Sequence, residues 1–344
     1  MDLTEAREKA RERMKGVCAV YKVCDGRADR LCQGIKYGKP LGMGGVGKGL
    51  AFTANVEALD RLYLKTRLIS PHAEPQMKTS FFGHEIGAPI YCSSLSGVNI
   101  SMGGAISELA FFRAVTQGCK ASGTISFAGD TAETFADRPG LQAIREAGGF
   151  GVQIFKPREQ TVLLGAIKEA EGAGALAVGV DLDGAGSVAM ALKGQPVFRK
   201  SISELKELVG STPLPFILKG ITSEEDAADA LETGCKMVVV SNHGGRTLDS
   251  VRGIADVLPR LAPILKGKVA IAADGGVRTG FDAFKMLALG ADFVGVGREF
   301  IRAAIGGGAE GVAAEVQFLF QDLRKAMIMT GCNTLSEIDG HVFT

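Results

Sequence analysis

The 344-residue sequence contains no tryptophan, only 6% aromatic residues and only four histidines. It also lacks an excess of either charge, with 39 Lys and Arg against 38 Asp and Glu. Because no basic field exists, nucleic acids and other polyanions are not expected partners. No apolar run reaches the roughly 18 residues that a membrane helix needs, and no apolar signal segment follows Met1. We expect a soluble, cytoplasmic protein.

Seven cysteines are present, and an odd number without an export signal favours free thiols over a disulfide framework. Cys18, Cys24 and Cys32 lie close together, but not in the Cys-x-x-Cys pairs of ordinary zinc or iron–sulfur sites. The sequence therefore predicts no metal site. We interpret the three residues as free thiols in a capping segment, and their role stays open.

From residue 88 onward, apolar segments of strand length alternate with helical patterns. The predicted strands are Pro89–Ser93, Gly123–Phe127, Gly151–Phe155, Ala175–Asp181, Pro215–Lys219, Met237–Asn242, Val269–Asp274 and Phe293–Gly297. The predicted helices are Ile106–Thr116, Gly140–Ala147, Gln160–Glu171, Ser203–Val209, Glu224–Thr233, Val251–Leu265, Gly280–Leu289 and Val312–Thr330. Eight such units require a parallel sheet with right-handed crossovers, which predicts an α/β protein with a closed (β/α)8 TIM barrel.

Residues 1–87 show no such alternation. We predict that they form an N-terminal helical and loop cap, not an independent domain, over a barrel of residues 88–344. Helical patterns cover Met1–Met14 and Asn55–Leu64. The stretch Gly42–Gly49 matches half of a phosphate-binding P-loop, but Gly49 replaces the required Ser or Thr and no apolar strand precedes it. We interpret this stretch as a flexible loop over the barrel mouth.

One histidine stands out by its position. The apolar run Val238–Val240 is followed by a glycine-containing loop that carries His243 and Arg246. In barrels of this kind the catalytic groups lie at the carboxyl ends of the strands. The other three histidines have no comparable setting, so His243 is the candidate catalytic histidine.

Two glycine-rich turns follow the seventh and eighth predicted strands. The first contains Asp274, Gly275, Gly276 and Arg278, and the second contains Gly297 and Arg298. In TIM barrels these two loops commonly form a phosphate site, where backbone N–H groups and arginine bind the phosphate oxygens. The two turns together predict a ligand that carries a phosphate.

These residues and their neighbours resemble the FMN-dependent 2-hydroxy acid oxidase and dehydrogenase family, which includes glycolate oxidase and lactate oxidase. The resemblance is carried by Lys219 in Ile-Leu-Lys-Gly-Ile, by Ser241–Asp249, by Asp274–Ala291, by Gly297-Arg298 and by Ala326–Cys332. It implies an oxidoreductase with bound FMN that oxidises a 2-hydroxy acid to a 2-oxo acid and passes hydride or electrons to the flavin. It also implies a homo-oligomer, usually a tetramer, and leaves the electron acceptor open.

The resemblance further implies roles for single residues. His243 resembles the general base, Asp181 the aspartate that orients its ring, and Arg246 the arginine that pairs with a substrate carboxylate. Lys219 resembles the lysine beside flavin N1, where a positive charge favours the reduced ring. The implied cofactor contacts are Gln153, Lys219, Ser241, Asp274, Gly275, Gly276, Arg278, Gly297 and Arg298.

The substrate half departs from the family pattern. Of the two tyrosines that the family usually carries there, one is matched by Phe155 and the other falls within Leu41–Gly44, while no arginine follows Asp183. Serines at the end of the first strand are candidate substitutes. Two alternatives therefore stay open: a non-redox FMN enzyme similar to type 2 isopentenyl diphosphate isomerase, and a flavin-binding protein whose substrate site has decayed.

Overall fold

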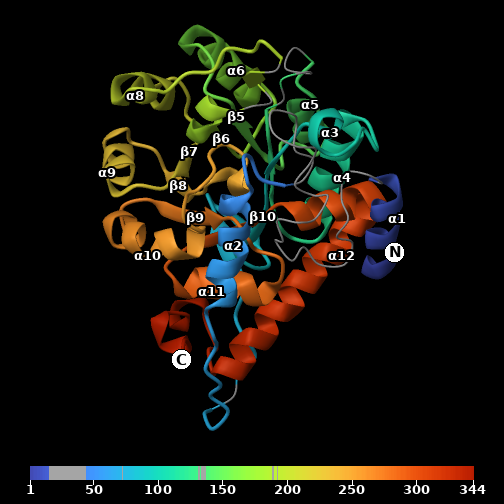
Figure 1. Cartoon of the computed structure of the whole chain (residues 1–344), viewed down its shortest axis with the longest axis vertical. Coiled ribbons are helices and arrows are strands. Elements are labelled where there is room, and N and C mark those ends of the chain that lie inside the picture. Colours follow the sequence, from blue (N-terminus) through green and yellow to red (C-terminus); the bar gives the residue numbers. More distant parts are fainter. Residues whose placement is uncertain (15–43, 72, 131, 133–136, 188–189, 192) are drawn as a thin grey trace.

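A closed barrel of eight parallel strands forms the centre of the molecule. The computed structural model describes residues 1–14, 44–71, 73–130, 132, 137–187, 190–191 and 193–344. The strand order is β10-β3-β4-β5-β6-β7-β8-β9, so strands that are consecutive in sequence are also neighbours in the barrel (Figure 1). The strands are β3 (Ile90–Leu95), β4 (Ser126–Ala128), β5 (Val152–Phe155), β6 (Ala177–Asp181), β7 (Phe216–Ile221), β8 (Met237–Val240), β9 (Ala270–Asp274) and β10 (Phe293–Val296). The predicted TIM barrel is confirmed.

Each barrel strand is followed by a helix that packs on the outside. These helices are α4 (Glu108–Ala121), α5 (Pro139–Glu146), α6 (Gln160–Gly172), α8 (Ile202–Gly210), α9 (Glu224–Glu232), α10 (Ile254–Leu265), α11 (Gly280–Ala288) and α12 (Arg298–Thr330). Local signals explain where several of them begin. In α8 and α11, the N-cap residues Ser201 and Thr279 form reciprocal capping boxes with Glu204 and Asp282.

The eighth helix is much longer than the sequence predicted. α12 begins at Arg298, directly after β10, whereas the expected start was Val312. The glycines at 306–308 weaken the helical pattern, and Gly308 does interrupt the helical backbone with φ 58°. Gly306 has a packing role, because a side chain there would overlap the carbonyl oxygen of Ala6 on α1 (Leu3–Arg13). Accordingly α1 lies along α12 (Figure 1).

The amino-terminal end of the barrel is closed by a hairpin that the sequence did not predict. Its strands β1 (Thr79–Phe81) and β2 (His84–Ile86) pair in antiparallel fashion. The ring centroid of Phe81 lies 5.8 Å from that of Phe127 and 5.5 Å from that of Phe293, inside the apolar core that fills this end of the barrel. Ligands therefore have access from the opposite, carboxyl-terminal end.

The helix α2 (Leu50–Asp60) packs against the carboxyl-terminal loops of the barrel and begins five residues before the predicted Asn55. The carboxylate of Asp249 accepts hydrogen bonds from the backbone amides of Lys48 at 2.7 Å and Ala51 at 3.1 Å. A carboxylate of the protein thus occupies the N-terminus of α2. The described part of the P-loop-like stretch, from Gly44 onward, contacts the loop after β8, because the amide of Val46 donates to the carbonyl of Gly245.

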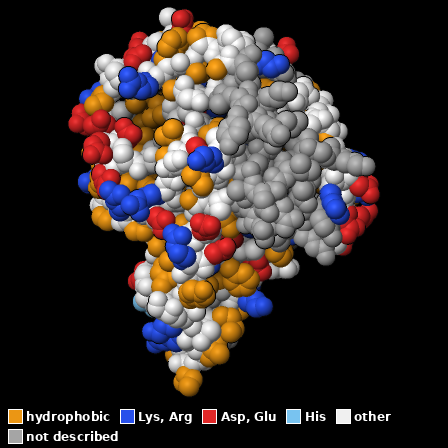
Figure 2. Space-filling view, viewed as in Figure 1, with side chains coloured by type: hydrophobic (Ala, Val, Ile, Leu, Met, Phe, Trp, Pro, Cys, Tyr) orange, Lys and Arg blue, Asp and Glu red, His pale blue; other side chains and the backbone are white. Residues whose placement is uncertain are grey.

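The segment after α2 runs beside the last turns of α12, where the amide of Arg67 donates to the carbonyl of Met329 (Figure 1). Hydrophobic side chains gather at this narrow end of the molecule (Figure 2), and Tyr63, Leu68 and Ile69 are exposed there. The chain finishes in the single turns η4 (Leu335–Glu337) and η5 (Gly340–Val342).

Within the described ranges, no helix is long and apolar enough to cross a bilayer. Cys18, Cys24 and Cys32 lie outside the described residues, whereas Cys92, Cys119, Cys235 and Cys332 are buried free thiols. Contacts of α1, α2 and the hairpin with the barrel agree with a cap, but whether residues 1–87 could fold alone stays a prediction.

Candidate active site

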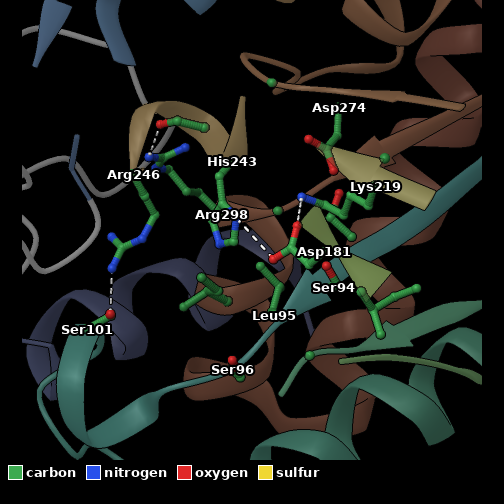
Figure 3. A pocket seen from close by; sticks show the side chains of 18 of the residues that line it. Ser94, Leu95, Ser96, Ser101, Asp181, Lys219, His243, Arg246, Asp274 and Arg298 are labelled. Atoms are coloured by element: carbon green, nitrogen blue, oxygen red, sulfur yellow. Dashed lines mark hydrogen bonds and ion pairs between the residues drawn. The ribbon is translucent and has the colours of Figure 1, made fainter. Parts of the chain in front are cut away.

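A cavity of about 870 Å³, including its open mouth, lies at the carboxyl-terminal end of the barrel. Most of the predicted site residues line it, namely Asp181, Lys219, His243, Arg246, Asp274, Gly275, Gly276, Arg278, Gly297 and Arg298 (Figure 3). Ser241 lies directly behind the wall and is fully buried. Gln153 is absent from the lining.

The charged residues at the base of the cavity form what we call the pocket cluster: Lys156, Asp181, Asp183, Lys219 and His243. Asp181 Oδ2 accepts from Lys156 Nζ at 2.6 Å, and its Oδ1 accepts from Lys219 Nζ at 3.1 Å. Burial opposes ionisation of Asp181, but the charges of His243, Lys156 and Lys219 hold its pKa well below its usual range. Asp181 therefore carries a negative charge at neutral pH.

The imidazole of His243 is oriented by two carboxylates. Its Nδ1 lies 3.2 Å from Asp181 Oδ2 and 3.1 Å from Asp183 Oδ1. A neutral ring in this setting donates the Nδ1 proton to a carboxylate, which leaves Nε2 as a proton acceptor. The nearby carboxylates would also stabilise the cation that forms when Nε2 takes a proton. The arrangement suits a general base.

Lys219 links the pocket cluster to the loop after β9. Its Nζ donates to Ser241 Oγ at 3.1 Å, and Ser241 Oγ donates in turn to Asp274. Burial alone would lower the pKa of Lys219, but the carboxylates of Asp181, Asp274 and Asp183 raise it above its usual range. A permanent positive charge thus lies in the cavity wall, which is where the sequence placed it.

Two members of the pocket cluster were not predicted. Lys156 follows β5, and Asp183 lies in the single turn η2 (Leu182–Gly186) that follows β6. Burial and the charge of Asp181 raise the pKa of Asp183. The signal that could have found Lys156 is its place directly after a buried strand of the barrel, the same argument that selected His243.

The prediction for Gln153 is wrong. Side chains alternate between the two sides of a barrel strand, and in β5 it is Val152 and Ile154 that face the barrel interior. Gln153 points outward, where its Nε2 donates to the carbonyl of Ala128 at 3.2 Å. Phe155, predicted to stand in place of a substrate-binding tyrosine, packs outside the barrel for the same reason. Ile154 lines the cavity instead.

Three features of the loops after β9 and β10 suit a phosphate. Arg278 is 4% exposed, and its Nε and Nη2 make no hydrogen bond within the described part of the chain. Gly297 is the N-cap of α12, so the free amides at the start of a long helix face the cavity. Arg298 adds a positive charge beside them.

The glycines of the β9 loop serve packing as well as ligand access. Gly275 and Gly276 have φ of 127° and 88°, which side chains rarely tolerate. A Cβ on Gly275 would lie 2.9 Å from Asn55 Oδ1 on α2, and one on Gly276 would overlap the backbone of Asn55. Their presence alone is therefore weaker evidence for a phosphate than the unpaired nitrogens of Arg278.

Arg246 directly follows the single turn η3 (His243–Gly245) in the loop after β8, and it lines the cavity. Its Nη2 donates to Ser101 Oγ at 2.6 Å, across the cavity on the short helix α3 (Val98–Ser101) (Figure 3). Burial lowers the pKa of Arg246 to about 10, which still leaves it charged at neutral pH. It is therefore a cation in the cavity wall.

The oxygen and nitrogen atoms of Asp181, Asp183 and His243 lie within 4.8 Å of one another, close enough to bind a cation. The ammonium groups of Lys156 and Lys219 already contact both oxygens of Asp181. A metal ion would have to displace them against their charge, so the geometry favours the hydrogen-bonded arrangement.

A TIM barrel with a buried arginine after β9 and an oriented histidine after β8, both lining one cavity at the carboxyl ends of the strands, has the layout of a barrel enzyme. The sequence model of the FMN-dependent dehydrogenase family matches residues 42–193 and 190–344. The chain belongs to this family, and its cofactor is FMN. The resemblance and cofactor predicted from the sequence are confirmed.

Related proteins share part of the sequence. The L-lactate dehydrogenase of Xanthomonas campestris pv. campestris is 47% identical over 126 residues, which are 37% of this chain and 33% of that protein. The L-lactate dehydrogenase of Pseudomonas aeruginosa is 46% identical over 124 residues, 36% of this chain and 32% of that protein. These matches span about a third of the length of the curated relatives.

Solved structures share the fold over most of the chain. A mutant flavocytochrome b2 with pyruvate bound has 26% identity and a TM-score of 0.75, covering 88% of this chain and 80% of that one. Mandelate oxidase with benzoyl-formic acid has 24% identity and a TM-score of 0.76, covering 97% and 96%.

The residues present fit FMN. The unpaired nitrogens of Arg278 and the first amides of α12 would hold its phosphate, and Lys219 provides a fixed charge for the flavin ring. Ser93 is 6% exposed, lines the cavity, and its hydroxyl has no partner among the described residues. It is a further candidate contact for the cofactor.

Proposed function

We propose that this protein oxidises a 2-hydroxy acid to the corresponding 2-oxo acid. The observation that carries the proposal is His243, whose Nδ1 lies within 3.2 Å of two carboxylates while Nε2 remains as the acceptor. The O–H proton of the substrate passes to Nε2, the C2–H bond breaks, and the C2–O bond becomes double. FMN, when bound, supplies the acceptor for the C2 hydrogen and its two electrons.

The roles of the other residues follow from their positions. Asp181 fixes the ring and compensates the charge that His243 gains. Arg246 is the cation for the substrate carboxylate, since its guanidinium can form two parallel hydrogen bonds with it. Lys219, held by Asp181 and Ser241, provides a positive charge when the flavin gains electrons.

The family match favours this redox reaction over an isomerase-type function. A decayed substrate site is also less consistent with a cavity that keeps His243, Arg246 and Lys156 together. The electron acceptor is not identified by any of these features. A homo-oligomer and a cytoplasmic location stay predictions, and sedimentation equilibrium would measure the first.

The test is an anaerobic titration of the purified yellow protein with short, long and aromatic 2-hydroxy acids. We expect one acid to bleach the flavin absorbance, and His243→Ala to slow the bleaching by about 10²- to 10⁴-fold because the base is lost. His84→Ala is the matched control, since His84 is exposed on the hairpin at the other end of the barrel. If no acid bleaches a flavin that dithionite reduces, the proposal is wrong.

A further inference from the structure

Lys156 occupies the place where a substrate hydroxyl must arrive. Its side chain lines the cavity and is largely buried, and its Nζ lies 3.4 Å from Nε2 of His243. We propose that Lys156 is a catalytic residue that donates a hydrogen bond to the C2 oxygen of the substrate while His243 removes its proton. This inference rests on the proposed function and adds a second residue to its chemistry.

The surrounding chain holds Lys156 in place. Its backbone amide donates to Asp130 Oδ2 at 3.0 Å, and Arg158 forms a two-pronged ion pair with the same carboxylate at 2.8 and 3.2 Å. Pro157 restricts the backbone of Lys156 to extended conformations. A Cβ on Gly184 would lie 2.8 Å from Lys156 Cδ, so glycine at that position leaves room for the lysine stem. The loop after β5 is therefore built to direct this ammonium into the cavity.

Asp181 does not need Lys156 as a partner. Its Oδ1 is paired with Lys219, and His243 Nδ1 lies near its Oδ2. A second buried lysine on the same carboxylate has a desolvation cost that packing alone would not require. The contact with Nε2, the atom that has to receive the substrate proton, indicates a role in the reaction.

The distances make the contact with the substrate direct. A substrate hydroxyl oxygen that donates a hydrogen bond to Nε2 lies about 2.7–2.8 Å from that nitrogen. An ammonium 3.4 Å from Nε2 can reach that same oxygen with a small side-chain rotation, because it has three donors and flexible bonds.

The ammonium supplies charge where it is needed. As the O–H bond breaks, negative charge develops on the C2 oxygen before the carbon–oxygen double bond is complete. Lys156 stabilises this charge and keeps its own proton throughout, so the proton on Nε2 and the hydrogen passed to FMN account for both hydrogens removed.

The kinetic experiment compares Lys156→Met and Lys156→Gln with the wild-type holoenzyme. We expect Lys156→Met to lower kcat about 100-fold or more with KM changed less than threefold, as for the loss of one oxyanion donor. Lys156→Gln keeps a hydrogen-bond donor without the charge, so its kcat should lie between that of Lys156→Met and that of the wild type. Lys200→Met is the matched control, because the Lys200 side chain is also buried, 1% exposed against 10% for Lys156, but bonds Gln160 and Glu204 outside the cavity. A kcat within threefold of wild type, or a loss confined to KM, overturns the assignment.

A binding experiment tests Lys156 without turnover. Flavin absorbance changes report the Kd of pyruvate against propionate and of benzoylformate against phenylacetate, pairs that differ in the C2 oxygen. Wild type should prefer the 2-oxo acid by about tenfold or more, and Lys156→Met should lose the preference while binding the other acid as before. Equal weakening of both acids would assign Lys156 to the carboxylate and overturn the inference.

The two arms separate the two proposals. Preference for the 2-oxo acid that disappears in Lys156→Met, without turnover of any 2-hydroxy acid, supports the contact and overturns the proposed function. Turnover of a 2-hydroxy acid by the wild type, with unchanged kcat in both Lys156 variants, supports the proposed function and overturns the role of Lys156. A wild-type protein that binds neither acid overturns both.

Discussion

Two groups of buried charges can be compared in this molecule. The pocket cluster borders the cavity, whereas a second group, here called the helix cluster, consists of Arg7 on α1 and Glu299, Arg302 and Glu315 on α12. Arg7 Nη2 donates to both oxygens of Glu315 at 3.1 and 3.0 Å, and Arg302 Nη1 donates to Glu299 Oε1 at 2.7 Å. Glu299 and Glu315 are both 0% exposed. Both groups pair carboxylates with cations, but only the pocket cluster has members whose side chains line the cavity.

The comparison shows that position decides what buried charges do. In the helix cluster most of the ion pairs are between its own members and join α1 to α12, although Glu299 Oε1 also lies 3.7 Å from Nε of Arg278 in the cavity wall. In the pocket cluster the same chemistry leaves Nε2 of His243 and Nζ of Lys156 at the wall of a cavity. We expect substitutions in the first to reduce stability and those in the second to reduce activity.

The largest effect on stability is expected for Arg7→Met. At about pH 9, where Glu315 is ionised because its pKa is raised to about 8, the change leaves this carboxylate buried without its main cation, and breaking a buried pair in this way costs about 3–5 kcal/mol. Urea unfolding with saturating FMN measures the change in the free energy of unfolding. A loss under about 1 kcal/mol would mean that the helix cluster contributes little to the packing of α1.

The next largest effect is expected for Asp181→Asn, and it should appear in catalysis. Without the carboxylate, His243 loses its orientation and its compensating charge, so kcat/KM should fall by about 100-fold or more. The free energy of unfolding should change less than in Arg7→Met, because the lysines that lose a partner adjoin the cavity and can be hydrated. Equal losses of stability in the two variants would contradict the comparison.

A smaller, pH-dependent effect is expected for Glu315→Gln. Burial and the charge of Glu299 raise the pKa of Glu315 from 4.5 to about 8 in the folded protein. Between these values folding takes up a proton, so this group makes wild-type stability fall as pH rises from about 5 to 8. The variant lacks that fall, and its stability relative to wild type should rise over the same range. Urea unfolding at pH 5 and pH 8 measures it, and a constant difference would argue against the raised pKa.

The smallest effect is expected for Asp256→Asn. Its partner Arg61 is 60% exposed at the side chain, and exposed ion pairs contribute about 0–1 kcal/mol. The same unfolding measurement gives the baseline against which the buried clusters are judged. A loss of stability as large as that of Arg7→Met would show that burial does not explain the difference between this exposed ion pair and the helix cluster.

The barrel was predictable because strands buried on both faces produce apolar runs, and eight of them alternate with helical patterns. The hairpin of β1 and β2 was not predictable, because strands of three residues are too short to show the alternation of apolar and polar side chains. The start of α12 was missed because the glycines that α1 requires for close packing look like the end of a helix. That requirement comes from a partner distant in sequence.

The candidate site was predictable where a polar residue lies at or close to the carboxyl end of a strand, as for Asp181, Lys219 and His243. Gln153 failed because one residue of offset moves a side chain to the other side of the strand. Lys156 and Asp183 also lie just after strands, but no motif marked them, and the direction of a side chain there depends on backbone angles that sequence alone does not supply. Contacts with Asp130 and Gly184 set that direction for Lys156.

The hydrogen bonds of Asp249 with Lys48 and Ala51, at the start of α2, join residues that are 201 and 198 positions apart in the sequence. Asp249 belongs to the loop that carries His243 and Arg246. These hydrogen bonds can therefore form only when the N-terminal part of the chain has packed against this loop. Closing so long a loop has a substantial entropic cost that is recovered late in folding. During synthesis, this contact therefore cannot form until about 200 residues beyond Lys48 have been made.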